Sequence, residues 1–81
     1  MSEIVEKVVG FVVKQIVDHP DEVTVEIVDD GDDSVVAEVH TNKADMGRVI
    51  GRKGRVANAI RSVAQAAADE EGLSTGVEFI D

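Results

Sequence analysis

The stretch that decides the fold runs Asp45-Met46-Gly47-Arg48-Val49-Ile50-Gly51-Arg52-Lys53-Gly54-Arg55-Val56-Ala57, where two glycines enclose two basic residues. Apolar residues recur at helical spacing on both sides, which predicts a short helix over 43–50 and a longer one from about Arg55 to Glu71. Glycines allow a sharp turn and the close approach of a ligand. The first amides of the second helix and its dipole favour an anion, and Arg52 and Lys53 stand at the loop tip. A sugar-phosphate backbone is the ligand that this arrangement predicts.

The segments before this stretch predict a helix and then a hairpin. Apolar residues at three- and four-residue spacing indicate a helix over 3–18, with Ser2 as its N-cap and Pro20 ending it near Asp18. Residues 22–28 and 34–41 alternate between apolar and polar side chains, which is typical of strands. The acidic turn Asp29–Asp33 joins them into an antiparallel hairpin.

The capping signals and the last strand complete the order of elements. Asn42 can cap the helix over 43–50, with Asp45 as a capping-box acid. Gly72 is the expected left-handed stop of the longer helix, and residues 76–80 alternate as a third strand. The order α-β-β-α-α-β predicts an α+β fold in one domain over 1–81, with the helices on one face of a three-stranded mixed sheet. Residues 34–41 and 76–80 should pair in parallel, because a helical crossover joins them.

The charge is distributed unevenly. The net charge is −9, which taken alone disfavours a polyanionic partner. Residues 43–61, however, hold six cations and one acid, a net charge of +5, whereas the rest holds two cations and 16 acids, a net charge of −14. Aromatic residues are limited to Phe11 and Phe79, which disfavours modules that stack bases on rows of aromatic rings.

The sequence resembles a known family. Ile50-Gly51-Arg52-Lys53-Gly54 is similar to the GxxG signature loop of KH domains, and residues 45–57 resemble the small single-KH proteins of the KhpA family. The order of elements matches the type II version of that fold. The resemblance covers the whole chain and implies a domain that clamps about four nucleotides of single-stranded RNA. It also implies an aliphatic groove, between helices and sheet, that receives the bases.

The resemblance assigns a role to each residue of the loop and its flanks. Gly51 and Gly54 would shape the clamp, and Gly47 would let the short helix pack closely. The other RNA-binding candidates are the phosphate contacts Arg52 and Lys53, the groove supports Val49 and Ile50, and the flanking cations Arg48 and Arg55. The acidic turn Asp29–Asp33 would correspond to the family's variable loop, which can border the groove, and should then repel phosphates.

Several other residues carry interpretations of their own. His19 has no evident partner and should be solvated, and Arg61 is either a surface residue or a nucleic-acid contact. The longer helix should bury Val56, Ile60, Val63 and Ala67 as its core stripe. Its remaining alanines indicate either contact with a partner helix or simply high helix propensity. The surplus alanines are Ala57, Ala59, Ala64, Ala66 and Ala68.

The predicted function is non-catalytic RNA binding. Cysteine is absent and no histidine cluster or Walker lysine motif is present, so an enzyme is not expected, nor is a cofactor or a metal. The resemblance implies an RNA chaperone or post-transcriptional regulator, with links to cell-envelope growth and division in some bacteria. The acidic N-terminus and the short apolar runs predict a soluble cytoplasmic protein. The resemblance also implies a homodimer, or a heterodimer with a larger KH-containing protein of the KhpB (Jag-like) type, without membrane insertion or a small-molecule substrate. The alternative is a protein-interaction module whose RNA affinity is vestigial, which the acidic remainder of the chain favours.

Overall fold

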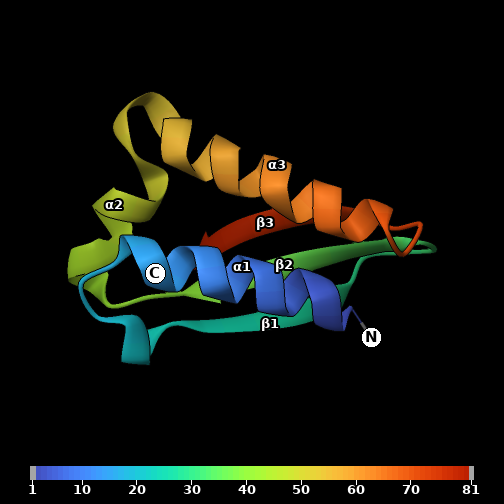
Figure 1. Cartoon of the computed structure of the whole chain (residues 1–81), viewed down its shortest axis with the longest axis horizontal. Coiled ribbons are helices and arrows are strands. Elements are labelled where there is room, and N and C mark those ends of the chain that lie inside the picture. The colour runs from blue at the N-terminus through green and yellow to red at the C-terminus, as the bar shows by residue number, and fades with distance from the viewer. Residues whose placement is uncertain (1, 81) are drawn as a thin grey trace.

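The helices and strands follow the predicted order in a computed structural model that describes residues 2–80. They are α1 (Glu3–Ile16), β1 (Thr24–Asp29), β2 (Ser34–His40), α2 (Met46–Ile50), α3 (Arg55–Asp69) and β3 (Ser74–Ile80), as Figure 1 shows. Three single 3-10 turns connect them, at Pro20–Glu22, Lys43–Asp45 and Arg52–Gly54. The α+β class and the α-β-β-α-α-β order are therefore confirmed.

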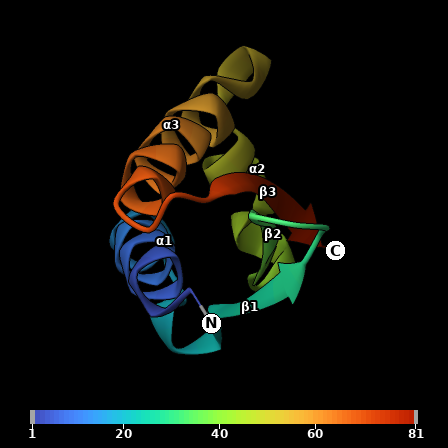
Figure 2. The same ribbon diagram turned by 90° about the vertical axis from the view of Figure 1, so that its right-hand side faces the viewer.

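The sheet has the order β1-β2-β3, with β2 at its centre. β1 pairs with β2 antiparallel, with Ile27 opposite Ala37. β2 pairs with β3 in parallel, with Ala37 opposite Val77, as the helical crossover predicts. In Figure 2 the helices α1 and α3 lie together on one side of the sheet. The molecule thus has two layers, and both β1 and β3 are edge strands.

The core lies between these two layers. α1 contributes Val5, Val9 and Val13, which follow each other one helical turn apart and are almost completely buried. The sheet contributes Ala37, Val39 and Val77 from the face that it turns toward the helices. Alternation along β2 places every second residue in this core, which explains why the period-2 pattern identified the strand.

The buried face of α3 differs from the predicted stripe. Ile60 and Ala67 are buried as expected, but Val63 is 41% exposed and Val56 is half-buried. The buried face instead consists of Ala57, Ile60, Ala64, Ala67 and Ala68. Small side chains allow α3 to lie close to α1 and the sheet, so close packing selects alanines for the core in place of the larger valines. Three of the surplus alanines, Ala57, Ala64 and Ala68, therefore belong to the core, and Ala59 and Ala66 remain exposed.

The helix ends confirm some of the predicted caps and correct others. Asn42 accepts a hydrogen bond from the Ala44 amide at 2.8 Å, as a capping residue should. Gly72 has a left-handed φ of 68°, and the Leu73 amide closes the helix end onto the Ala68 carbonyl. Ser2 occupies the N-cap position of α1, but its hydroxyl donates to Oε1 of Glu71 at 2.9 Å and caps no amide. α1 ends at Ile16, two residues earlier than predicted, because Val17 is extended.

Candidate nucleic-acid interface

The loop between α2 and α3 depends on the backbone of Gly51. Its φ of 77° and ψ of 171° lie in a region open essentially to glycine alone. A Cβ atom at this position would lie 2.5 Å from Cγ2 of Val56 and 2.9 Å from the Val56 amide nitrogen. The Gly51 amide also ends α2 by donating to the Gly47 carbonyl at 2.9 Å. Gly51 therefore sets the turn out of α2 and admits the start of α3 at close range.

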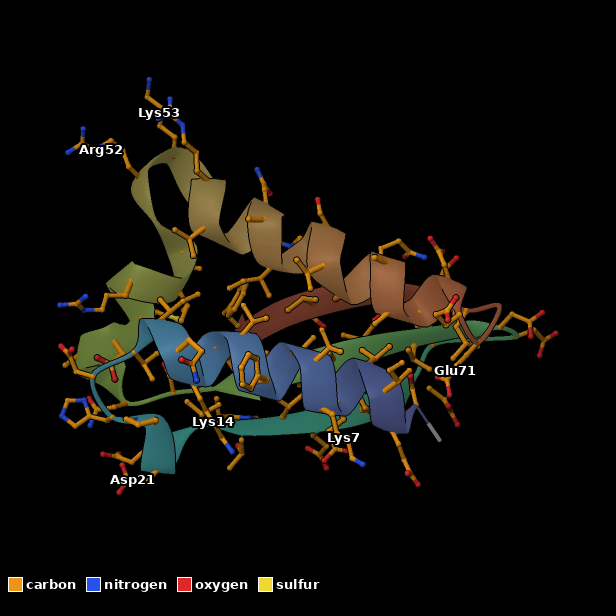
Figure 3. All side chains as sticks on the ribbon, viewed as in Figure 1. Lys7, Lys14, Asp21, Arg52, Lys53 and Glu71 are labelled. Atoms are coloured by element: carbon orange, nitrogen blue, oxygen red, sulfur yellow. The ribbon has the colours of Figure 1, made fainter. Side chains whose placement is uncertain are left out.

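The next residues turn the chain back into α3. Lys53 and Gly54 are both left-handed, with φ values of 57° and 72°. The Gly54 amide donates to the Gly51 carbonyl at 3.1 Å, which closes the loop on itself. Arg52 and Lys53 are exposed, and Figure 3 shows both side chains pointing away from the body of the molecule. The loop thus presents two cations at a tip of fixed backbone geometry.

The start of α3, beside the same loop, is accessible to an anion. Gly54 is its N-cap and carries no side chain that could accept hydrogen bonds from the first turn. The helix dipole adds partial positive charge there, and no acidic residue occupies that turn. Arg55 begins the helix and is exposed. Amides, dipole and side-chain cations therefore converge on the region where a phosphate is predicted to lie.

The flanking residues divide between the surface and the core. Arg48 is exposed, and its Nη2 atom lies 3.4 Å from Oδ2 of Asp18. Val49 is completely buried, so it anchors α2 and presents no surface, whereas Ile50 is half-buried beside the loop. Gly47 is exposed, and a Cβ atom there would meet nothing within 4 Å. The expectation that Gly47 allows close packing of the short helix is therefore wrong.

Arg61 is held against the edge strand β3. Its Nε atom donates to the Val77 carbonyl at 3.4 Å, and Nη1 donates to Oδ1 of Asn58 at 3.1 Å. The guanidinium carbon lies 5.7 Å from the centre of the Phe79 ring, within the range of a cation–π interaction. The sequence left two interpretations of Arg61 open, and these contacts fix its side chain without deciding between them.

A buried carboxylate supports the segment that leads into α2. Asp45 is only 1% exposed, and its Oδ2 accepts hydrogen bonds from the His19 amide at 3.0 Å and from the His19 ring at 2.9 Å. Burial works to raise the pKa of Asp45, but hydrogen bonds from His19 and the Asp18 backbone outweigh it and lower that pKa. The hydrogen bond to Asp45 raises the pKa of His19. His19 therefore has a partner, contrary to the sequence-based prediction, and Asp45 bridges two segments instead of acting as a capping-box acid.

The acidic turn at 29–33 lies far from the loop. Figure 1 shows the turn between β1 and β2 and the loop between α2 and α3 at opposite ends of the long axis. The Asp33 carbonyl accepts a hydrogen bond from the Ser74 amide at 2.9 Å, which ties the turn to the start of β3. The turn is therefore distant from the loop at which phosphates are expected (Figure 1), which does not support the predicted repulsion of phosphates by its carboxylates. Among residues 2–80, no group of three or more His, Asp or Glu side chains could hold a metal ion.

Comparison with known proteins identifies the family. The model of the KhpA/KhpB KH domain matches residues 6–79, a span that includes the loop, β1, β2 and all of β3 except its last residue. The chain belongs to the KhpA/KhpB KH-domain family. The resemblance seen in residues 45–57 is thereby confirmed, and the family is a non-enzymatic one.

Relatives of this KH domain match it over most of their length. RNA-binding protein KhpA of Clostridium perfringens is 42% identical over 80 residues, covering 99% of this chain and 100% of that protein. RNA-binding protein KhpA of Clostridium acetobutylicum is 46% identical over 69 residues, covering 85% and 91%. The protein of the same name from Leifsonia xyli is 47% identical over 70 residues, covering 86% and 88%.

A solved structure shares the fold at low sequence identity. The crystal structure of Era in complex with MgGDPNP and nucleotides 1506–1542 of 16S ribosomal RNA aligns with a TM-score of 0.63 and 17% identity. The alignment covers 94% of this KH domain and 30% of the Era chain. Within residues 2–80, no helix has both the length and the apolar character needed to cross a membrane.

Proposed function

We propose that this KH domain binds single-stranded RNA without catalysis, holding the sugar-phosphate backbone at the loop Gly51–Gly54. The observation that carries the proposal is the convergence of Arg52, Lys53 and the uncapped start of α3 on one exposed point. Relatives that share 42–47% of its residues are named RNA-binding proteins. Backbone contacts carry no sequence information, so the domain has low sequence selectivity.

The proposed binding residues act in three ways. Gly51 and Gly54 give the loop its shape, and Arg52 and Lys53 contact phosphates. The half-buried Ile50 contributes apolar surface beside the loop, while the buried Val49 supports α2 from inside. Arg55 adds charge directly at the start of α3. Arg48 adds charge from α2, although its ion pair with Asp18 competes with a phosphate.

The exposed face of α3 supports a second element of the proposal, a homodimer. Ala59, Val63 and Ala66 lie along one side of the helix and are exposed. Two copies of α3 packed on this side would bury apolar surface and leave both loops free. Two linked loops raise the avidity for a long RNA without any new contact. A backbone binder of this kind fits the role of an RNA chaperone or post-transcriptional regulator in the cytoplasm, alone or with a larger KH-containing partner.

A reversal of charge at the loop tests the RNA-binding proposal. The double variant Arg52→Glu/Lys53→Glu should lose nearly all affinity for a fluorescent oligouridine and keep its melting temperature, because both side chains project into solvent. The matched control is Lys7→Glu/Lys14→Glu, which changes the net charge equally from two exposed positions of α1. The control should retain most of the affinity.

The affinity for oligouridine, measured at several salt concentrations, also tests the alternative of an interaction module with vestigial RNA affinity. For the unmodified protein, log affinity should fall with log salt by about 0.7 per phosphate contacted, and the few cations at the loop predict roughly two to four such contacts. Equal affinities of the folded loop variant and the unmodified protein would refute RNA binding at this loop.

A further inference from the structure

A groove of about 500 Å³ lies between α1 and β1, away from the loop Gly51–Gly54. Its lining residues are Glu6, Lys7, Gly10, Phe11, Lys14, Val23, Thr24 and Val25. Figure 3 shows Lys7 and Lys14 extending from α1 toward β1, whereas Arg52 and Lys53 point away from the opposite side of the helical layer. The two surfaces are therefore separate.

The groove combines an apolar floor with an exposed aromatic ring. Phe11 is 66% exposed, far more than any other large apolar residue among residues 2–80. A Cβ atom at Gly10 would make only an ordinary van der Waals contact, 3.8 Å from Cγ2 of Val25. The missing side chain of Gly10 leaves space between the helix and the strand. Phe11 therefore offers an apolar contact surface at the edge of this space, next to Val25 and Val23 of the lining.

The charge around Phe11 points to an acidic occupant. Lys7 and Lys14 are the two cations of this chain that lie outside the basic segment 43–61, and both flank Phe11 on the same helix. Among residues 2–80 neither lysine forms an ion pair. They lie seven positions apart on the helix, which corresponds to a rise of about 10 Å. An occupant would meet them with two carboxylates at roughly that spacing.

The strand that borders the groove favours a peptide over a nucleic acid. Among residues 2–80, β1 is an edge strand that pairs with β2 alone, so alternate backbone groups on its other side can accept a further strand. An extended peptide can use them, and its side chains can then reach the neighbouring helix. RNA carries a phosphate at every nucleotide and would bring several of them against Glu6 and the acidic remainder of the chain, whose net charge is −14. A peptide with two carboxylates can place both of them opposite Lys7 and Lys14 and bring no further negative charge to the groove.

We propose that this groove binds an extended acidic peptide segment of a partner protein. The segment adds to the free edge of β1, places an apolar side chain against Phe11, and pairs a carboxylate on either side of it with Lys7 and Lys14. Because this site and the loop lie on different sides of the molecule, peptide and RNA can be bound at the same time.

The direct test is a titration followed by amide chemical shifts of the full chain. The probe is a capped nine-residue peptide of alternating valine and threonine, with a central leucine and a glutamate two positions to either side. We expect the shifted amides to lie in residues 7–14 and 23–25, and those of residues 51–54 to stay in place. The same peptide with lysines for glutamates should not bind.

Matched variants tie the binding to the groove. Lys7→Glu/Lys14→Glu should weaken the peptide affinity at least tenfold, and Arg52→Glu/Lys53→Glu, which carries the same charge change, should leave it unaltered. Phe11→Ala should also weaken it, while Phe11→Leu keeps an apolar contact and should retain more affinity. Lys7, Phe11 and Lys14 are exposed, so the variants at these positions should keep the melting temperature of the unmodified protein.

Three results would overturn the proposal. One is the absence of any shift in residues 7–14 and 23–25 at millimolar peptide. Another is equal binding of the lysine peptide, which would remove the charge complementarity. The third is a shift of the same amides by oligouridine but not by the peptide, which would make the groove a second RNA surface. None of these results depends on RNA binding at the loop.

Discussion

The ring Nδ1 of His19 lies 2.9 Å from Oδ2 of Asp45, across 26 residues of sequence. Asp45 is buried and His19 is partly exposed, so the pair joins the surface segment after α1 to the interior beneath α2. The backbone amide of His19 donates to the same oxygen at 3.0 Å. Because α2 leads directly into the loop Gly51–Gly54, this contact holds in place the start of the helix from which the loop emerges.

The pair predicts how stability depends on pH. The pKa of His19 is raised above 6.5, so its contribution is complete below pH 6.5 and is lost as the pH rises through the higher value in the folded protein. The pKa of Asp45 is lowered below 3.8, so its contribution is present above pH 3.8 and is lost as the pH falls through the lower folded value. The pair should therefore contribute most to the free energy of unfolding between pH 3.8 and pH 6.5.

The measurement compares unfolding by urea across pH for the unmodified protein, Asp45→Asn and the exposed control Asp21→Asn. The deficit of Asp45→Asn should be largest between pH 4 and pH 6.5 and shrink above it, and the control should show no such pattern. A deficit that keeps the same size from pH 5 to pH 9 would contradict the assigned role of the His19 charge.

The two loop glycines should differ in their tolerance of alanine. At Gly54 a Cβ atom would meet nothing within 4 Å, so Gly54→Ala pays only for the left-handed backbone, roughly 1–2 kcal/mol. At Gly51 the backbone region itself costs about 1–3 kcal/mol for other residues, and the clash with Val56 adds to this. Thermal and urea unfolding of both variants should show the larger loss for Gly51→Ala. Equal losses would mean that the contact with Val56 relaxes without cost.

The acidic turn should have little influence on RNA affinity. We expect a variant in which four aspartates are replaced by Asn to change the RNA affinity by less than about twofold at physiological salt, where charges are screened over about 8 Å. The four replaced residues are Asp29, Asp30, Asp32 and Asp33. The physical reason is that the turn and the loop lie at opposite ends of a molecule 34 Å long. Fluorescence anisotropy with oligouridine measures the effect. A tenfold gain in affinity would show that bound RNA passes close to the turn.

Charges introduced along α3 should separate folding from self-association. Ala64 is completely buried, so Ala64→Glu places an unpaired charge in the core and should cost several kcal/mol, enough to unfold most of the protein. Ala66 is exposed, so Ala66→Glu should stay within about 0.5 kcal/mol of the unmodified stability. Circular dichroism measures the folding of both variants.

Sedimentation then tests the proposed dimer with the folded variant. Ala66→Glu should sediment as a monomer and bind long RNA less tightly than the unmodified protein, which should sediment as a dimer. Sedimentation of the unmodified protein as a monomer at micromolar concentration would exclude the dimer through Ala59, Val63 and Ala66.

Local chemistry determined much of this protein. The alternation in 34–41, the two glycines around Arg52 and Lys53, the N-cap Asn42 and the helix stop at Gly72 depend on backbone preferences and near-neighbour spacing. Each of them predicted its element or turn to within a few residues, and the order of elements then required the parallel pairing of β2 with β3. These features could be read from the sequence because they act within a few residues of the chain.

Only the tertiary structure decided which residues meet across long sequence separations. Helical periodicity favoured Val63 for the core, but the close approach of α3 to the rest of the core selected the small Ala64 and Ala68. His19 had no neighbour in sequence that marked Asp45 as its partner. The distance of the acidic turn from the loop depends on where both ends of α3 lie. Such relationships arise from how layers pack in space, and packing depends on volumes and directions that local sequence patterns do not encode.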